Sequence, residues 1–219
     1  MDTKAKIPEH QAVYEQLRDM ILRGQFAPGD PLTIMGLTKK MSAGMTPIRE
    51  ALRRLTAENA LNSLENRRII VPELNAQDIE DIYFLRLTVE PELARRAVQN
   101  IGIQEIENLA GIDADINTAL SQGDVEAYLK LNNLFHFEIY KAAQSRSLFH
   151  VARSLWVQVG PSLRVVSGRY GTANLPDKHV DLLKAFRAKD GEAAAQAMKD
   201  DLRQSLLLVN SPAKHNMIK

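Results

Sequence analysis

Cysteine is absent from the 219 residues of this chain. Its absence excludes disulfides, thiolate chemistry and the cysteine spacings of zinc ribbons. No apolar run approaches the roughly 20 residues that cross a bilayer, and residues 1–8 lack the apolar core of a secretory signal. We therefore expect a cytoplasmic protein without a membrane partner.

The sequence also lacks a large excess of positive or negative charge, and it lacks catalytic motifs. Residues 1–75 hold 11 Lys/Arg against 9 Asp/Glu, and residues 76–219 hold 17 against 18. This asymmetry is too small to indicate nucleic-acid binding by itself. The sequence contains no nucleophile motif, glycine-rich phosphate loop or His-Glu-x-x-His signature. We therefore expect that the protein is not an enzyme.

One segment, Thr46-Pro-Ile-Arg-Glu-Ala-Leu-Arg-Arg-Leu55, predicts an amphipathic helix that begins at Thr46. Its apolar residues recur at helical spacing: Ile48, Ala51, Leu52 and Leu55. Arg49 and Arg53 lie on the opposite face. Such a helix suits insertion into a DNA major groove, where arginines reach guanine edges or phosphates.

The surrounding residues predict a winged helix-turn-helix domain over residues 8–72. The expected elements are a helix from Pro8 to Gly24, a turn cluster at 26–31, a helix at 34–41, the helix from Thr46, and strands at 61–64 and 68–71. The two strands flank a basic turn, Glu65-Asn66-Arg67, followed by Arg68. We expect this hairpin to be the wing.

Residues 75–210 show helical periodicity without a strand pattern, which predicts an all-α bundle of about six helices. Asn75 caps the first helix, with Asp78 three residues later. Further breaks are expected near Gly102, Gly123, Ser145, residues 170–176 and residues 190–191. Pro161 should end or kink the helix that begins near Arg146. The overall fold class is therefore mainly α, with a small β-hairpin wing.

Polar residues interrupt the apolar stripes of four helices in this bundle. They are Arg86 and Glu90, then Asn132 and His136, then His179, and finally Asp201. Buried polar groups without partners are costly, so we expect these residues to meet one another or a ligand. Imidazole, carboxylate and amide donors suit zinc, nickel or manganese. A small carboxylate could then bind the metal and also Arg86.

Two simpler interpretations stay open for these residues. A single inward histidine is usually a hydrogen-bonded core residue. Arg86 and Glu90, four residues apart on one helix, could equally form an ion pair at a helix interface.

The first block resembles the GntR family of bacterial transcription regulators. The segments that carry the resemblance are Gly29-Asp-Pro-Leu32, Thr46–Leu55, Glu58 and the wing. The second block looks like the FCD-type ligand-binding domain of the FadR-like branch. Its matching segments are Arg86-Leu-Thr-Val-Glu90, Asn132-Asn-Leu-Phe-His136, His179–Phe186 and Asp190–Met198.

The resemblance implies a homodimer that binds a pseudo-palindromic double-stranded DNA operator and releases it when a small organic acid binds. Many FCD domains hold a divalent metal with an Asp or Asn and three His. Asn132, His136 and His179 occupy the first three positions, and Asp201 stands at the fourth. Arg86, Glu90 and Asn132 are then the candidate effector ligands.

The predicted DNA-binding helix, Thr46–Leu55, is preceded by Met45, where the family commonly has arginine. We therefore assign DNA contacts to Arg49 and Thr46, with Arg53 as a backbone contact or scaffold, and to the wing residues Asn66, Arg67 and Arg68. The leading hypothesis is a metabolite-responsive repressor. The alternative is a small helical metalloenzyme acting on a carboxylate substrate, in which Glu90 would be the acid/base group.

Overall fold

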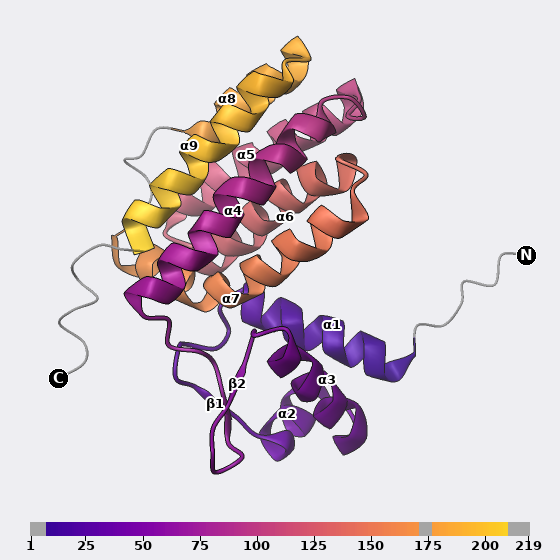
Figure 1. The fold of residues 1–219 in the computed structure, drawn as a ribbon, viewed down its shortest axis with the longest axis vertical. Coiled ribbons are helices and arrows are strands. Elements are labelled where there is room, and N and C mark those ends of the chain that lie inside the picture. The colour runs from indigo at the N-terminus through magenta and orange to yellow at the C-terminus, as the bar shows by residue number, and fades with distance from the viewer. Residues whose placement is uncertain (1–7, 171–176, 210–219) are drawn as a thin grey trace, which may run out of the picture.

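The structure is a computed structural model that describes residues 8–170 and 177–209. A smaller N-terminal domain lies below a larger helical domain in Figure 1. The N-terminal elements are α1 (Glu9–Leu22), β1 (Pro31–Leu32), α2 (Ile34–Met41), α3 (Met45–Ala57), β2 (Asn62–Ser63) and β3 (Ile69–Ile70). The helical domain contains α4 (Ala76–Ala97), α5 (Ile103–Gln122), α6 (Val125–Ala142), α7 (Arg146–Tyr170), α8 (Lys178–Ala188) and α9 (Gly191–Val209). This arrangement confirms the predicted fold class.

The small sheet has three antiparallel strands in the order β1-β3-β2. The sequence predicted only the hairpin, and it predicted longer strands. Pro31, assigned to a turn cluster, instead pairs with Ile70 at the edge of the sheet, where a residue without an N–H is tolerated. The ladder continues beyond β1, because Val71 donates its N–H to the carbonyl of Asp30 at 3.0 Å.

Helix α3 begins one residue earlier than predicted. Gly44 occupies the N-cap with an extended backbone, and the helix has no side-chain cap. The hydroxyl of Thr46 therefore does not cap α3, and Thr46 lies exposed in the first turn. The predicted apolar face is confirmed, since Ile48, Ala51, Leu52 and Leu55 are buried. This face packs against α1.

Helix α4 organises the helical domain by packing against α9, α7 and α6. It begins with the predicted capping box: the Asn75 side chain accepts from the Asp78 N–H at 3.0 Å, and Asp78 accepts from the Asn75 N–H at 2.9 Å. Helix α5 ends at Gly123, which has a left-handed backbone with φ of 68°. The predicted break at residues 171–176 lies outside the described residues.

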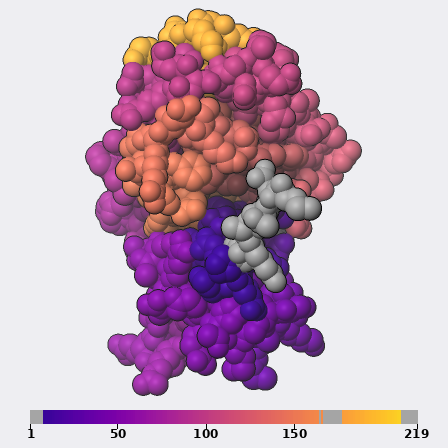
Figure 2. Space-filling view, turned by 90° about the vertical axis from the view of Figure 1, so that its right-hand side faces the viewer, coloured from indigo at the N-terminus to yellow at the C-terminus, as the bar shows by residue number. Residues whose placement is uncertain are grey.

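Helix α7 carries the contact between the two domains. It continues through Pro161 to Tyr170. Of the two predicted effects of this proline, an end or a kink of the helix, the end is therefore wrong. Pro161 is buried, and tertiary packing here outweighs the local cost of a missing N–H. Directly before it, a Cβ built on Gly160 would lie 3.2 Å from the carbonyl oxygen of Leu22 in α1. Figure 2 shows α1 in indigo directly beneath α7 in orange.

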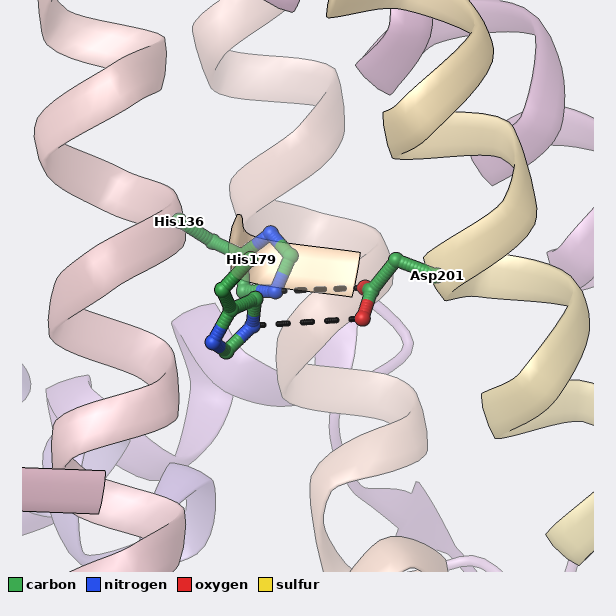
Figure 3. Close-up of side chains that lie close together, drawn as sticks. All are labelled: His136, His179 and Asp201. Atoms are coloured by element: carbon green, nitrogen blue, oxygen red, sulfur yellow. Dashed lines mark ion pairs between the residues drawn. The ribbon is translucent and has the colours of Figure 1, made fainter. Parts of the chain in front are cut away.

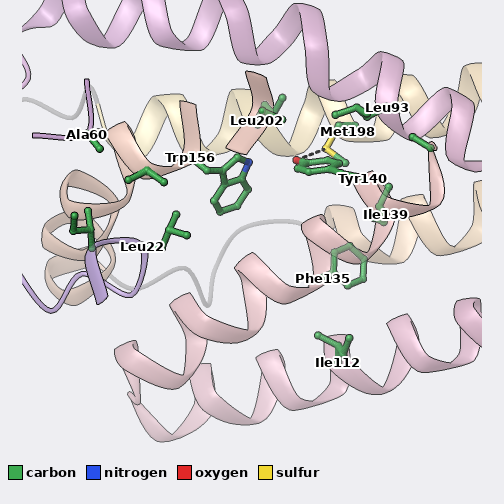
Figure 4. Packing of buried hydrophobic residues seen from close by; sticks show 14 of the residues in the cluster. Leu22, Ala60, Leu93, Ile112, Phe135, Ile139, Tyr140, Trp156, Met198 and Leu202 are labelled. Carbon is green, nitrogen blue, oxygen red and sulfur yellow. Dashed lines mark hydrogen bonds between the residues drawn. The ribbon is translucent and has the colours of Figure 1, made fainter. Parts of the chain in front are cut away.

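One continuous apolar cluster runs from the N-terminal domain into the helical domain. Figure 4 shows part of it, from Leu22 and Ala60 past Trp156 to Tyr140 and Met198. The two domains therefore share one apolar core. Within the described ranges, no helix has the length and hydrophobicity needed to cross a bilayer.

Candidate functional site

A pocket of about 260 Å³ opens among the helices of the larger domain. Each of the six helices of this domain contributes polar or aromatic side chains to the pocket lining: Arg86 from α4, Asp113 from α5, Asn132 and His136 from α6, Trp156 from α7, His179 from α8 and Asp201 from α9. The structure therefore brings together the polar residues that the sequence placed inward on four helices, with the exception of Glu90.

Two histidines and a carboxylate converge in this pocket (Figure 3). His136 Nε2 lies 3.4 Å from Asp201 Oδ2, and His179 Nε2 lies 3.9 Å from Asp201 Oδ1. One ligand atom from each residue falls within 4.8 Å of the others. Both imidazoles are buried, whereas the Asp201 side chain is 21% exposed. Burial raises the pKa of Asp201, an effect that the positive charges of His179 and Arg86 oppose.

The other ring nitrogen of His179 is held by Asp113. The distance from His179 Nδ1 to Asp113 Oδ1 is 2.9 Å. Because an ionised carboxylate only accepts hydrogen bonds, Nδ1 carries the proton. Phe135 stacks on the imidazole at 4.1 Å with an interplanar angle of 23°. Burial lowers the pKa of His179, but the Asp113 hydrogen bond and the charge of Asp201 raise it above its usual value overall.

The orientation of His136 follows from a second buried chain of hydrogen bonds. Its Nδ1 lies 3.3 Å from the hydroxyl oxygen of Tyr140, and this hydroxyl donates a hydrogen bond to Glu90. In the tautomer with the proton on Nδ1, this nitrogen donates to the Tyr140 oxygen and the Nε2 lone pair is directed toward Asp201. Burial and the nearby His179 lower the pKa of His136 well below its usual value, so this ring is neutral at pH 7.

Arg86 and Glu90 form the intrahelical ion pair that the sequence left open. Their Nε–Oε1 distance is 2.6 Å, and both side chains are buried. Burial lowers the pKa of Arg86, but the charge of Glu90 outweighs it and keeps the guanidinium protonated. Among the described residues, Arg86 nevertheless retains a free donor, because its Nη1 is buried without a hydrogen-bond partner there. Arg86 also lines the pocket.

Glu90 differs from its predicted role as an effector ligand. It is 0% exposed and is not among the residues that line the pocket. Its carboxylate accepts from Arg86, from Tyr140 and from Trp156 Nε1, the last at 3.2 Å. These donors occupy Glu90 behind the pocket wall. It therefore orients Arg86 and Tyr140, and it is poorly placed as the acid/base group of a metalloenzyme.

Sequence reasoning missed Asp113, Tyr140 and Trp156. For Asp113 a signal existed, because it lies four residues after Leu109 and seven after Ile106, both on the buried face of α5. The same search for polar residues in apolar stripes would have found it. Tyr140 and Trp156 resemble ordinary core residues in sequence, and only their contacts with Glu90 distinguish them.

The exposed face of α3 carries Thr46, Arg49 and Arg53. Arg53 pairs with Glu50 at 2.5 Å while remaining 76% exposed, so it stays available to a phosphate. The neighbouring Arg54 belongs to the scaffold, because its guanidinium lies 3.6 Å from the centre of the Tyr14 ring.

The predicted wing turn forms between β2 and β3. Leu64 donates its N–H to the carbonyl of Arg68 at 2.8 Å, and the Asn66 side chain accepts from the Arg68 N–H at 3.0 Å. Arg67 has a left-handed backbone with φ of 61°. Asn66, Arg67 and Arg68 are all exposed. The turn therefore presents two basic side chains to solvent.

A winged helix-turn-helix joined to a helical domain defines a class of protein, the winged-helix DNA-binding regulators. Two family models identify the chain more closely. Residues 9–71 match "Bacterial regulatory proteins, gntR family", and residues 81–204 match the FCD domain. The chain belongs to the GntR family, in its FCD-containing branch, and it is a transcriptional regulator of that type.

Similar proteins agree with this assignment. The chain is 28% identical to the HTH-type transcriptional regulator McbR of Escherichia coli over 201 residues, which cover 90% of each chain. It is 25% identical to a probable D-xylose utilization operon transcriptional repressor of Paenarthrobacter nicotinovorans, covering 90% of this chain and 89% of that one. The solved structure of E. coli McbR/YncC superposes with a TM-score of 0.88 at 26% identity, covering 96% of this chain and 100% of that chain.

Proposed function

We propose that this protein is a homodimeric repressor that releases its operator when a small organic acid binds, together with a divalent metal, in the pocket of the helical domain. The observation that carries the proposal is the convergence of ligand-type side chains in that pocket. The Nε2 atoms of two imidazoles and a carboxylate face one another, and Arg86 Nη1 is buried without a hydrogen-bond partner among the described residues. Buried polar groups of this kind require partners.

A divalent metal fits the first part of this set. His136, His179 and Asp201 would hold it, with Asn132 as a fourth ligand from the same pocket wall. Nitrogen and oxygen donors of these types suit zinc, nickel or manganese, and the replacement of a third histidine by Asp201 makes the set richer in oxygen. A bound metal would supply Lewis acidity toward a carboxylate oxygen.

An anionic effector fits the second part. The guanidinium of Arg86 is charged, and its Nη1 would donate to a carboxylate in the pocket. The volume of about 260 Å³ lies below the range of about 300–1,000 Å³ for drug-sized ligands. These features favour a small organic acid over a larger metabolite.

We propose two groups of residues for operator contacts. From α3 they are Thr46, Arg49 and Arg53, and from the wing they are Asn66, Arg67 and Arg68. Met45, 53% exposed at the start of α3, cannot make a bidentate contact with guanine, so Arg49 carries more of the base recognition. Repression is inferred from the named function of the P. nicotinovorans relative. A cytoplasmic location follows from access to bacterial operator DNA.

The DNA-binding part of the proposal is tested by Arg49→Ala. This variant should lose binding to its own promoter in an electrophoretic shift assay while remaining a dimer by light scattering. Arg187→Ala is the matched control, since Arg187 is an exposed arginine of α8 that pairs with Glu107; it should bind DNA normally. Unchanged promoter binding by Arg49→Ala would refute the assignment.

The pocket is tested by His136→Ala and His179→Ala, each of which should lower bound zinc per chain in elemental analysis. The matched control is His150→Ala, because His150 lies exposed on α7 and should leave the zinc content unchanged. A thermal-shift screen of small organic acids with and without zinc should then identify an effector that releases DNA. Unchanged zinc content in both pocket variants would show that these histidines serve packing alone.

A further inference from the structure

We propose that Asp113 is a positioning residue that fixes the tautomer and ring orientation of His179, so that His179 presents Nε2 to the metal. The inference rests on the proposed metal site and adds to it a residue that is not itself a ligand. Asp113 comes from α5, whereas the ligands come from α6, α8 and α9. It is 6% exposed and lies 2.9 Å from His179 Nδ1.

Besides Asp201, two carboxylates lie near His179, and they make different contacts. Asp177 caps α8, accepting from the backbone N–H groups of His179 at 3.0 Å and Val180 at 3.3 Å. It thereby anchors the first turn of the helix that carries the imidazole. Asp113 instead contacts the ring itself, opposite the nitrogen that faces Asp201. Asp177 thus fixes the backbone of His179, and Asp113 fixes its ring.

A neutral imidazole can carry its proton on either nitrogen, and only the unprotonated nitrogen can ligate a metal. The Asp113 carboxylate accepts a hydrogen bond from Nδ1–H, so the proton stays on Nδ1 and the lone pair is on Nε2. Carboxylates that hold metal-bound histidines in this way also raise the basicity of the ligand. Stacking on Phe135 restricts rotation of the ring, so tautomer and direction are set together.

The two histidines are held by partners of different charge. His179 has an acid at Nδ1, whereas His136 has the hydroxyl of Tyr140 at 3.3 Å. Tyr140 keeps its proton, because burial and the charge of Glu90 raise its pKa well above the usual value. Loss of the charged, shorter contact should therefore affect metal binding more than loss of the neutral one. Asp113→Ala should weaken zinc binding more than Tyr140→Phe does.

The first experiment measures zinc affinity by competition with a chromophoric chelator. Asp113→Ala should weaken binding by about 10–100-fold. Asp113→Asn keeps an amide oxygen that can accept from Nδ1 but not the charge, so it should recover part of that loss. The matched control is Asp115→Ala, because Asp115 is an exposed acid two residues along α5; its affinity should equal that of the wild type. Wild-type affinity in Asp113→Ala would overturn the inference.

The second experiment reads the tautomer directly. Long-range ¹H–¹⁵N spectra of the zinc-free protein at alkaline pH should show His179 protonated at Nδ1 in the wild type and in Asp113→Asn. Asp113→Ala should shift the proton toward Nε2. A wild-type His179 protonated at Nε2 would overturn the inference without any variant. If instead the wild type shows the expected tautomer but binds no zinc, the proposed metal site fails while the orienting role of Asp113 stands.

Discussion

Replacing Glu90 by glutamine should destabilise the helical domain far more than the same change at Glu92, two residues further along α4. Glu90 is 0% exposed and balances the buried guanidinium of Arg86. Glutamine cannot balance that charge, and removing one partner of a buried pair costs about 3–5 kcal/mol. Glu92 pairs with Arg95 and Arg96, but its side chain is 30% exposed. An exposed pair contributes only about 0–1 kcal/mol.

The assay is urea unfolding followed by the fluorescence of Trp156, the single tryptophan of the chain. Trp156 contacts Glu90 directly and lies in the helical domain, so its signal reports the unfolding of that domain. The free energy of unfolding falls by about 2 kcal/mol per molar urea, so Glu90→Gln should lower the midpoint urea concentration by about 2 M. Glu92→Gln should shift it by less than about 0.5 M.

Equal midpoints for the two variants would refute this account of the buried pair. A double variant, Arg86→Leu with Glu90→Leu, separates charge from packing. Removing both charges should restore much of the lost stability, because a buried pair and an apolar replacement of similar volume are often close in free energy. A double variant as unstable as Glu90→Gln would mean that the loss comes from packing, or from the lost hydrogen bonds of Tyr140 and Trp156 to Glu90, instead of an unpaired charge.

Three further predictions concern the domain contact, the wing and pH. Gly160→Ala should lower stability by about 1–3 kcal/mol in thermal unfolding, because the new methyl group meets the Leu22 backbone; the control Gly111→Ala, with nothing within 4 Å, should stabilise α5. Arg67→Gly suits the left-handed backbone of the wing, so it should leave the fold intact. It should weaken operator binding and reduce the slope of log affinity against log salt concentration by about 1. An unchanged slope would contradict a phosphate contact. Zinc affinity should fall by about tenfold per pH unit below the raised pKa of His179, because His179 must lose its proton before it can bind zinc. His136 is already neutral and adds no such dependence. A zinc affinity that stays constant from pH 8 to pH 5 would contradict this prediction.

The helical elements could be predicted because their signals are local. The apolar spacing in α3 and the cap at Asn75 depend on neighbouring residues only. Strand β1 was missed because its two residues form a strand through pairing with β3, more than 30 residues away. Pro31 reads as a turn former, and no local feature indicates its partner Ile70.

The convergence of His136, His179 and Asp201 was predictable for a related reason. A polar side chain in an apolar stripe must find a partner in the core, so several such chains are expected to meet. How they meet depends on three-dimensional contacts. Glu90 lies on the same helix face as Arg86, yet its contacts with Tyr140 and Trp156 turn it away from the pocket. Spacing along one helix cannot reveal that difference.

Crystals grown with zinc would test the central claim most directly, through an anomalous difference map measured at the zinc absorption edge. The account predicts one strong peak per chain within coordination distance of His136 Nε2, His179 Nε2 and a carboxylate oxygen of Asp201. Diffraction data on the low-energy side of the edge serve as the control, since a zinc peak should weaken sharply there. A zinc-saturated crystal with no peak at these three atoms, or with a peak only elsewhere, would contradict the claim.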